Sequence, residues 1–481
     1  MTTPSGFDIV FRGATVIDGT GGPRRTADVA VRGDRVVAVG EVAPGDATRT
    51  VDARGLVLAP GFIDAHTHDD RAVLATPDMT PKVSQGVTSV IAGNCGVSLA
   101  PLAGREPVPP LNLLGSAEHW RFPTVGDYMA RVRDEPPAVN VALLAGHSTL
   151  RVGAMDSLDR PATAAEIAVM VERLDDALAA GCIGLSTGLA YPPAIASPTS
   201  EVIRLAERVH AHGGIYTTHM RNEGTEIVAS IEETLEVGRR AGVPVVISHH
   251  KCSGRPSWGK SVQTLAMIAE ARRTQRVDLD VYPYTASSTV LIADWAKRAE
   301  RVMVTWSEGR PDCAGRDLEE IRAEWGCSLE EACARLQPAG AIYHQMDEAD
   351  LRRILAFDGA MVGSDGLPHD AFPHPRLWGT FPRVLGHYVR EVGLMGLEEA
   401  VHRMSGRTAA VFGLADRGVL REGAFADLVL FDPDAIADRA EFRDPKQPAA
   451  GIQEVFVNGR SVWADGAPSG ERPGRALRRA A

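Results

Sequence analysis

Side chains that bind transition metals recur at the ends of short apolar runs in this 481-residue chain. A His-x-His pair, His66 and His68, closes one run, and Cys95, His219 and His249 close others. Because side chains repeat every two residues along an extended chain, both imidazoles of the pair point to the same side. Imidazole nitrogen and thiolate sulfur are ligands that zinc prefers. Together these residues predict a zinc centre.

Asp365 ends the last of these runs, where a carboxylate can both bind a metal and accept a proton. Taken singly, each residue has an ordinary explanation. A lone histidine at a strand end is more often a hydrogen-bonded structural residue, and a free cysteine is usually a small buried apolar side chain. The recurrence at several strand ends is what favours a metal centre.

Eight apolar runs alternate with helical stretches such as residues 163–180 and 226–241, which predicts an α/β chain. Eight buried parallel strands joined by helices are what a (β/α)8 TIM-like barrel requires, and sites in this fold lie at the carboxyl ends of the strands. The metal-binding residues are therefore expected at one mouth of the barrel. The runs are 57–66, 88–95, 139–147, 182–189, 214–219, 244–249, 277–283 and 361–365.

Both ends of the chain have a different residue pattern, in which Gly and Asp separate short segments typical of strands. We predict that residues 1–60 and 415–481 form one small β-sandwich and that residues 61–414 form the catalytic barrel. A long segment at about 284–346, after the seventh strand, is expected to be an insertion that lies over the barrel mouth like a lid.

The composition excludes several classes of partner. With 51 Lys+Arg against 62 Asp+Glu, the net charge of −11 offers no attraction to a polyphosphate, so no nucleic-acid partner is expected. The chain has no secretory signal pattern and no apolar stretch long enough for a membrane span, which predicts a cytoplasmic protein with no membrane partner. The six cysteines are too few and too irregularly spaced for a disulfide framework. The oligomeric state stays open.

Several motifs resemble those of a known family. The stretch PGFIDAHTH at 60–68, with the terminal sandwich and the late Asp365, resembles the amidohydrolase superfamily of metal-dependent hydrolases. The match narrows to the D-aminoacylases, that is, N-acyl-D-amino-acid deacylases. The motifs of that narrower match are GNCG at 93–96, TTHMRNE at 217–223, ISHHK at 247–251, DVYPY at 280–284 and GSDGLP at 363–368.

This resemblance implies zinc-dependent hydrolysis of the amide of an N-acyl-D-amino acid, giving a free D-amino acid and a carboxylate. Asp365 is implied to be the catalytic acid and base. The resemblance further implies one tight zinc site and a second, weaker one that shares the cysteine. The tight site is made of Cys95, His219 and His249, and the second of His66, His68, Asp365 and Cys95.

The distribution of lysines favours this branch of the superfamily. Only five of the 51 basic residues are lysines, and none occurs from 83 to 250. Relatives that hydrolyse cyclic amides, such as hydantoinases and dihydroorotases, bridge two metals with a carboxylated lysine from strand four. That ligand is missing here, and Cys95 is the available anion. A cyclic-amide hydrolase is kept as an alternative, as is a non-catalytic barrel scaffold, which should have lost its metal ligands.

The α-carboxylate of an N-acyl amino acid needs a binding group of its own. By resemblance, Lys251, Tyr282, Ser288 and Arg376 hold it, with Arg as a bidentate fork and Lys as a point charge.

The pocket for the substrate side chain is implied to be bordered by Ala190, Tyr343 and Met346. The small Ala190 predicts a roomy pocket and hence apolar side chains, while Lys297 and Arg298 keep an acidic side chain open. Two further residues get no metal role: His147 is left as a supporting or structural residue, and Glu223 is interpreted as a helix-start carboxylate.

Overall fold

A parallel sheet of eight strands forms the centre of the molecule in the computed structural model, which describes residues 6–43 and 47–480. Backbone bonds join the two edge strands, because Ala65 N donates to Val362 O and Asp365 N to His66 O. This closure confirms the predicted (β/α)8 barrel. In sheet order its strands are β6 (Phe62–Asp64), β7 (Val87–Ala92), β10 (Asn140–Gly146), β11 (Gly184–Gly188), β12 (Ile215–His219), β13 (Val245–Ile247), β14 (Val277–Val281) and β18 (Ala360–Val362).

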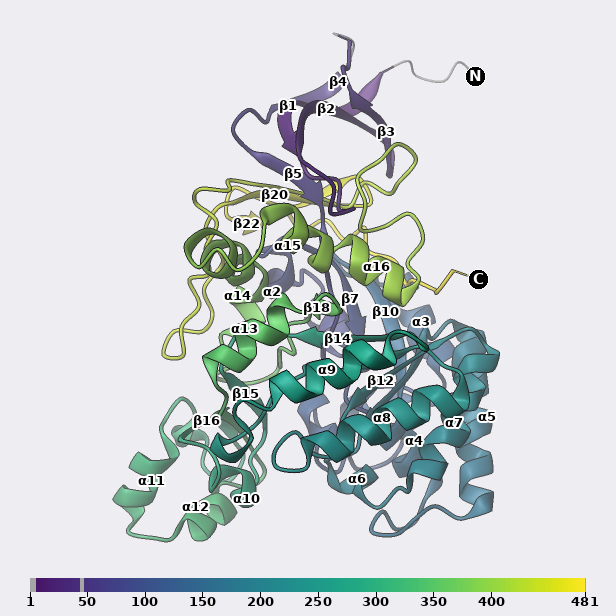
Figure 1. Ribbon diagram of the computed structural model, residues 1–481, viewed down its shortest axis with the longest axis vertical. Coiled ribbons are helices and arrows are strands. Elements are labelled where there is room, and N and C mark those ends of the chain that lie inside the picture. Colours follow the sequence, from purple (N-terminus) through teal and green to yellow (C-terminus); the bar gives the residue numbers. More distant parts are fainter. Residues whose placement is uncertain (1–5, 44–46, 481) are drawn as a thin grey trace.

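Helices cover the outside of the barrel (Figure 1). The predicted helix at 163–180 begins with Thr163, whose hydroxyl accepts from Glu166 N while the Glu166 carboxylate accepts from Thr163 N, and it ends at the left-handed Gly181. No helix in the described part of the chain is both long and apolar enough to cross a membrane. The main covering helices are α3 (Val125–Asp134), α5 (Ala164–Ala180), α7 (Thr199–Ala211), α8 (Ile227–Ala241), α9 (Ser261–Ala271), α13 (Glu348–Ala356) and α15 (Leu397–Met404).

The first predicted strand, 57–66, is in fact two strands. β5 (Val57–Pro60) pairs with β1 (Phe7–Val16) and β19 (Leu428–Phe431) outside the barrel, whereas β6 begins the barrel at Phe62. Gly61 separates them, and a side chain there would collide with Thr88 of the next barrel strand. The apolar run therefore passes from one sheet into the other at a glycine.

Both ends of the chain contribute to a second, nine-stranded sheet, as predicted. Phe11 and Phe456, from opposite ends of the sequence, meet edge to face with ring centroids 5.3 Å apart. In Figure 1 the amino-terminal strands lie at the pole opposite the helices α10 to α12. The remaining strands are β2 (Arg25–Arg32), β3 (Arg35–Gly40), β4 (Ala47–Asp52), β20 (Ile452–Val457), β21 (Arg460–Ala464) and β22 (Ala467–Pro468). The exact boundaries proposed for the two domains stay a prediction.

The segment after the seventh barrel strand folds as a separate lobe (Figure 1). Its antiparallel sheet has the order β15 (Ala286–Val290), β17 (Ala339–His344), β16 (Arg301–Ser307). Three helices, α10 (Ala293–Ala296), α11 (Leu318–Trp325) and α12 (Leu329–Leu336), complete it, and it has its own apolar cluster around Val304, Ile321 and Leu336. This is the insertion expected at about 284–346.

A buried lysine holds the seam at which the barrel closes. Lys82, in the short helix α2 (Thr80–Val83), is 1% exposed. Its Nζ donates to Asp64 Oδ2 at the end of β6 (2.8 Å) and to Ser364 Oγ just after β18 (2.9 Å), and it lies 3.2 Å from Asp69 Oδ2. Because these residues flank His66, His68 and Asp365 in sequence, the ammonium fixes the strand ends that carry predicted metal ligands.

Replacing Lys82 by Met should destabilise the fold strongly. The change keeps the length of the side chain but leaves the buried carboxylates of Asp64 and Asp69 without their cation, a loss that costs about 3–5 kcal/mol. Urea denaturation followed by circular dichroism measures it. Lys297→Met is the matched control, because Lys297 is exposed and its ion pairs with Asp294 and Glu330 are screened by solvent. A K82M protein as stable as K297M would contradict this role.

Candidate metal centre

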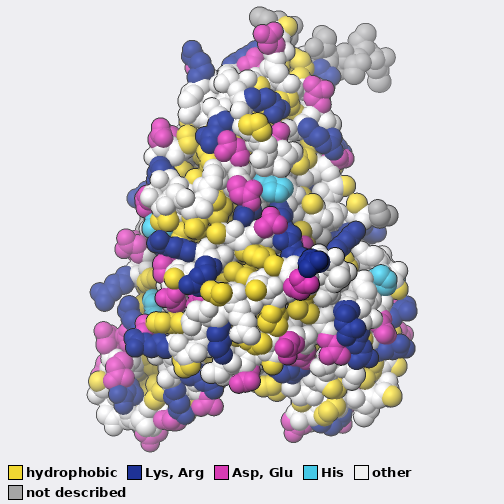
Figure 2. Space-filling model, in the orientation of Figure 1, with side chains coloured by type: hydrophobic (Ala, Val, Ile, Leu, Met, Phe, Trp, Pro, Cys, Tyr) yellow, Lys and Arg dark blue, Asp and Glu magenta, His cyan; other side chains and the backbone are white. Residues whose placement is uncertain are grey.

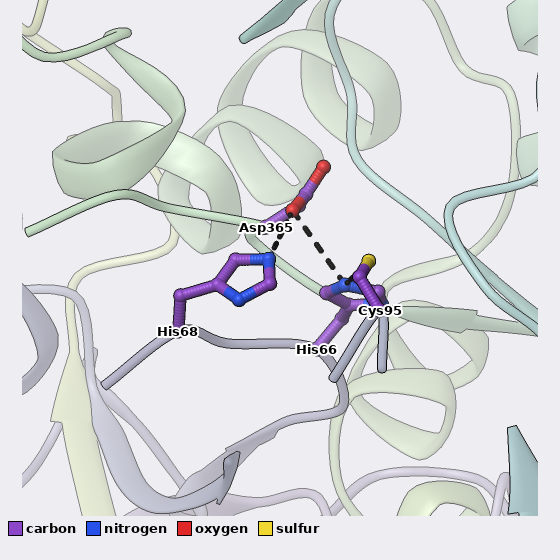
Figure 3. A group of neighbouring side chains, drawn as sticks. All are labelled: His66, His68, Cys95 and Asp365. Atoms are coloured by element: carbon purple, nitrogen blue, oxygen red, sulfur yellow. Dashed lines mark hydrogen bonds and ion pairs between the residues drawn. The ribbon is translucent and has the colours of Figure 1, made fainter. Parts of the chain in front are cut away.

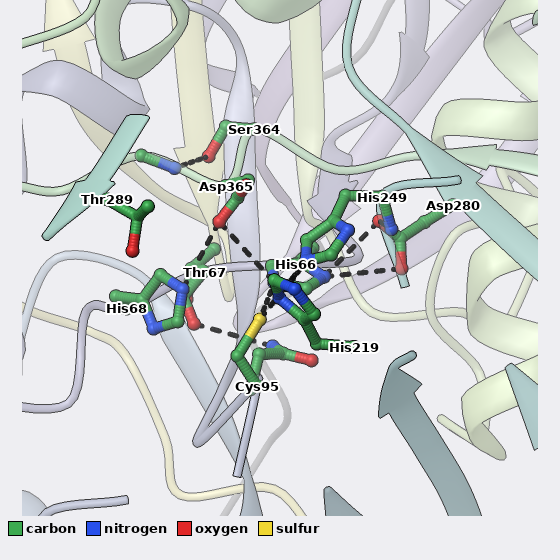
Figure 4. A network of polar contacts seen from close by, with 12 residues as sticks. His66, Thr67, His68, Cys95, His219, His249, Asp280, Thr289, Ser364 and Asp365 are labelled. Carbon is green, nitrogen blue, oxygen red and sulfur yellow. Dashed lines mark hydrogen bonds and ion pairs between the residues drawn. The ribbon is translucent and has the colours of Figure 1, made fainter. Parts of the chain in front are cut away.

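Six predicted ligands meet at the carboxyl ends of the barrel strands (Figure 4). Each lies at or just beyond the end of a strand: His66 and His68 after β6, Cys95 after β7, His219 at the end of β12, His249 after β13 and Asp365 after β18. All six side chains are buried. The barrel thus brings together residues that are up to 299 positions apart in the sequence, from His66 to Asp365.

The first group consists of Cys95, His219 and His249. His249 Nε2 lies 3.3 Å from Cys95 Sγ and 2.9 Å from His219 Nδ1. The second group consists of His66, His68, Asp365 and the same Cys95. In it, His66 Nε2 lies 3.2 Å from Cys95 Sγ, and Asp365 Oδ1 lies 3.2 Å from His68 Nε2 and 3.5 Å from His66 Nε2 (Figure 3). Two adjacent ligand groups therefore share one sulfur atom.

The charges around the two groups favour ionised acids. Burial alone would raise the pKa of Cys95, but the facing rings of His66 and His249 hold it well below its ordinary value. Burial also opposes ionisation of Asp365, yet the Arg376 guanidinium, 2.9 Å from Oδ2, and His66 hold the pKa of that carboxyl well below its ordinary value. The centre therefore presents a thiolate and a carboxylate to any cation.

Three of the ligands have an unusual backbone. Cys95, His249 and Asp365 lie in the left-handed region, with φ of 54°, 36° and 51°. This region is uncommon for residues other than glycine, and such strain is concentrated at functional sites. At each position the chain leaves its strand sharply, and the side chain turns into the barrel mouth.

These donors fit zinc. One sulfur anion, four imidazoles and one carboxylate converge, and within each group the donor atoms lie within 4.8 Å of one another. Zinc binds this mixture of sulfur, nitrogen and oxygen donors. A supporting carboxylate is also present, because Asp280 Oδ2 lies 3.3 Å from His66 Nδ1, the ring nitrogen turned away from the sulfur, and Asp280 Oδ1 accepts from His249 N.

A cavity of about 1100 Å³ opens onto five of the six ligands, namely His68, Cys95, His219, His249 and Asp365. Barrel loops form one side, with Leu113, Tyr191 and Ile195, and the insertion forms the other, with Trp295 and Arg298. Figure 2 shows the lower edge of the molecule hollowed between the lobe of the insertion and the lobe that includes α4 (His147–Ala154) and α6 (Pro192–Ile195). The insertion is thus a wall of the cavity that leads to the ligands.

Most residues predicted to bind substrate lie at this cavity or next to it. Ala190, Lys251 and Ser288 line it. Arg376 is fully buried beside Asp365, donates from Nη2 to Ser288 O (3.0 Å), and stacks over the Tyr282 ring at 4.5 Å. Among the described residues, the hydroxyls of Tyr282 and Ser288 and the Nε of Arg376 have no hydrogen-bond partner although they are buried. Buried polar groups usually have a partner, so these three groups are available to hydrogen-bond a molecule in the cavity.

The structure does not bring Tyr343 and Met346 to the cavity. Side chains alternate along β17, and Tyr343 faces the apolar cluster of the insertion, where its hydroxyl donates to Val290 O at 2.8 Å. Met346 borders a separate small pocket beside Tyr282 and Tyr284. The sequence spacing could not show on which face of β17 Tyr343 falls, nor where the chain turns after His344, before Met346.

The interpretation of Glu223 as a helix-start residue is wrong. The nearest helix, α8, begins at Ile227, and the partly exposed Glu223 lies at the cavity wall beside the first ligand group, with Oε1 3.0 Å from His249 Nδ1 and 2.7 Å from Lys251 Nζ. The available signal was its position four residues after a ligand, in TTHMRNE. His147 lies instead in a buried network, with Nε2 2.9 Å from Glu201 Oε1, which also pairs with Arg151.

Comparisons with known proteins agree with this geometry. Residues 49–253 and 242–463 match the Amidohydrolase family. A D-aminoacylase of Alcaligenes xylosoxydans xylosoxydans is 54% identical over 99% of this chain and 98% of its own, and an N-acyl-D-aspartate deacylase of the same organism is 52% identical over 98% and 95%. Among solved structures, an N-acyl-D-glutamate deacylase from Bordetella bronchiseptica, complexed with zinc and a phosphonate mimic of the tetrahedral intermediate, superposes with a TM-score of 0.95. It is 47% identical, and the match covers 98% of this chain and all of that one.

The ligand pattern, the closed barrel and these full-length matches lead to one conclusion. The chain belongs to the amidohydrolase family, within its D-aminoacylase group.

Proposed function

We propose that this protein is a zinc-dependent hydrolase that cleaves the amide of N-acyl-D-amino acids to a free D-amino acid and a carboxylate. The observation that carries the proposal is the pair of ligand groups sharing Cys95 at the floor of a cavity, next to buried donors without partners. Relatives of about half identity that are named for deacylation of D-amino acids, and the zinc in one of them, support both the reaction and the metal.

The tight zinc is assigned to Cys95, His219 and His249, and a second site to His66, His68, Asp365 and the shared sulfur. Zinc held by these residues would supply Lewis acidity, which lowers the pKa of water and polarises a carbonyl. Asp365 accepts a proton from the attacking water and later gives a proton to the leaving nitrogen. The water oxygen bonds to the amide carbon, the carbon–nitrogen bond breaks, and the products are the carboxylic acid and the free amine. Arg376 keeps Asp365 ionised and oriented for the first transfer.

The substrate carboxylate is assigned to Lys251, Tyr282, Ser288 and Arg376. The partnerless donors of the last three support this assignment, because a carboxylate accepts several hydrogen bonds at once. Lys251 supplies a second cation at the cavity wall.

For the substrate side chain we propose an apolar preference. The part of the cavity around Cys95 is lined by Leu113, Tyr191 and Leu367, which favour apolar groups. Most rim cations are already neutralised: Lys297 lies 3.0 Å from Asp294 and from Glu330. Arg298, however, also lines the cavity and has no carboxylate partner among the described residues, so an acidic side chain is the second candidate.

The two other functions considered from the sequence are less well supported. No lysine is present on β11, the fourth barrel strand, where cyclic-amide hydrolases carry their bridging ligand. A non-catalytic scaffold is disfavoured because every expected ligand position is filled.

A panel of N-acetyl- and N-formyl-amino acids in both configurations tests the function, with zinc measured on the same protein sample. We expect turnover of D-substrates with bound zinc, faster for D-leucine or D-phenylalanine derivatives than for D-aspartate or D-glutamate derivatives. If the acidic D-substrates are turned over faster, and Arg298→Met abolishes that advantage, the enzyme prefers acidic rather than apolar side chains. Turnover confined to L-substrates would overturn the proposed function.

Asp365→Asn should lower kcat by roughly 10²–10⁴-fold, the usual contribution of a general acid–base group. The variant keeps the shape of the side chain but cannot accept the proton. Because Cys95, His219 and His249 are untouched, the tight zinc should stay bound, as metal analysis would show. A variant with bound zinc and near-normal kcat would remove Asp365 from the mechanism.

Tyr282→Phe should raise KM by about tenfold or more, since a hydrogen bond to a charged group contributes about 1.5–3 kcal/mol. Tyr284→Phe is the matched control: its hydroxyl is also buried, but its ring packs on His374 (5.2 Å) and Arg383 (4.9 Å) away from Asp365. Steady-state kinetics with N-acetyl-D-leucine separates them. Equal KM values in both variants would argue against a carboxylate contact at Tyr282.

A further inference from the structure

Glu223 contacts the outer edges of two ligand histidines at once. Its Oε1 lies 3.0 Å from His249 Nδ1, and its Oε2 lies 3.6 Å from His219 Nε2. The opposite nitrogens, His249 Nε2 and His219 Nδ1, lie 2.9 Å apart, and the first of these also faces Cys95 Sγ. One carboxylate therefore spans both rings on the side turned away from the sulfur.

This arrangement determines which ring nitrogens carry protons. A histidine binds a metal through the nitrogen that has no proton, so the other nitrogen must be an N–H donor. With the inner nitrogens facing the metal, His249 Nδ1–H has Glu223 Oε1 within hydrogen-bonding distance at 3.0 Å, and His219 Nε2–H faces Glu223 Oε2 at the longer distance of 3.6 Å. The same carboxylate accepts from Lys251 Nζ at 2.7 Å, so its oxygens are acceptors at the outer edge of this ligand group.

Lys251 makes an acceptor at this position necessary. Its Nζ lies 2.7 Å from Glu223 Oε1 and also 2.7 Å from His249 Nδ1. An ammonium group can only donate. If no carboxylate were present, Lys251 would donate to His249 Nδ1, and the proton of the ring would move to Nε2. That tautomer presents an N–H to the metal and cannot bind it.

We propose that Glu223 is a positioning residue that holds His219 and His249 in their zinc-binding tautomers, against the competing ammonium of Lys251. The inference rests on the proposed function, because it assigns a role to Glu223 only if zinc is bound by these histidines. Carboxylates behind metal-binding histidines fix their orientation, and their loss typically weakens metal binding 10–100-fold.

Glu223→Gln tests the role, because the amide turns an N–H₂ group towards one of the two rings. Zinc affinity, measured by competition with a chelator, should fall by about 10–100-fold. The absorption spectrum of the Co²⁺-substituted protein should also change, since it reports ligand geometry without any turnover. Glu233→Gln is the matched control: Glu233 is a neighbouring acid paired with Arg221 at 2.8 Å and does not contact His219 or His249, so wild-type zinc affinity is expected.

Because Lys251 competes with Glu223 at His249 Nδ1, a double variant gives a second prediction. In Glu223→Gln/Lys251→Met the donor that drives the wrong tautomer is gone, so the double variant should bind zinc more tightly than Glu223→Gln alone. Lys251→Met by itself should bind zinc about as well as the wild type. A double variant no tighter than Glu223→Gln would overturn the tautomer argument.

Zinc binding by the variants tests the role of Glu223, whereas zinc binding and activity of the wild type test the proposed function. Circular dichroism checks that each variant is folded, and if Glu223→Gln does not fold, Glu223→Asp decides: its shorter carboxylate should weaken zinc binding. Wild-type affinity in the folded Gln or Asp variant would overturn the role of Glu223. A wild-type protein that binds no zinc and hydrolyses no N-acyl-D-amino acid would overturn the proposed function instead.

Discussion

The sulfur of Cys95 is the constraint on which the barrel mouth depends. A buried anion is costly unless it is paired, and in the described part of the chain the imidazoles of His66 and His249 lie 3.2 and 3.3 Å from this sulfur. The sulfur belongs to both ligand groups, so His66 and His249 must approach it from different directions. Both Cys95 and His249 have a left-handed backbone where they leave their strands, as has Asp365 in the second group.

The regular parts of this fold could be predicted from the sequence. Barrel strands are buried on both faces and therefore appear as continuous apolar runs, and their carboxyl ends were marked by His, Cys and Asp. The split of the first run was not predictable, because it depends on the contact between Gly61 and Thr88, two residues on different strands. The orientation of Tyr343 was missed for a similar reason, since either face of β17 is compatible with the same spacing, and Met346 lies in the loop beyond that strand.

The residues that contact the metal-binding side chains from behind were the hardest to predict. Glu223 and His249 are 26 positions apart, and only the side-by-side pairing of β12 and β13 brings them together. In isolation Glu223 has the pattern of an ordinary loop acid. Its importance becomes visible only when its partners, two imidazoles and one ammonium, are seen to compete for the same protons. Lys82 is a parallel case, because its role depends on Asp64 at the end of β6, on Asp69 beyond it and on Ser364, which follows β18.

The cavity is built by two separate parts of the chain. All six ligands, Asp365 included, lie at or just beyond the ends of barrel strands, whereas one wall comes from a lobe that has a sheet of its own. Mutations or changes of length in that lobe can therefore alter which molecules enter without moving any ligand. Substrate specificity can thus change during evolution through this lobe, while the metal ligands and the catalytic residue stay the same.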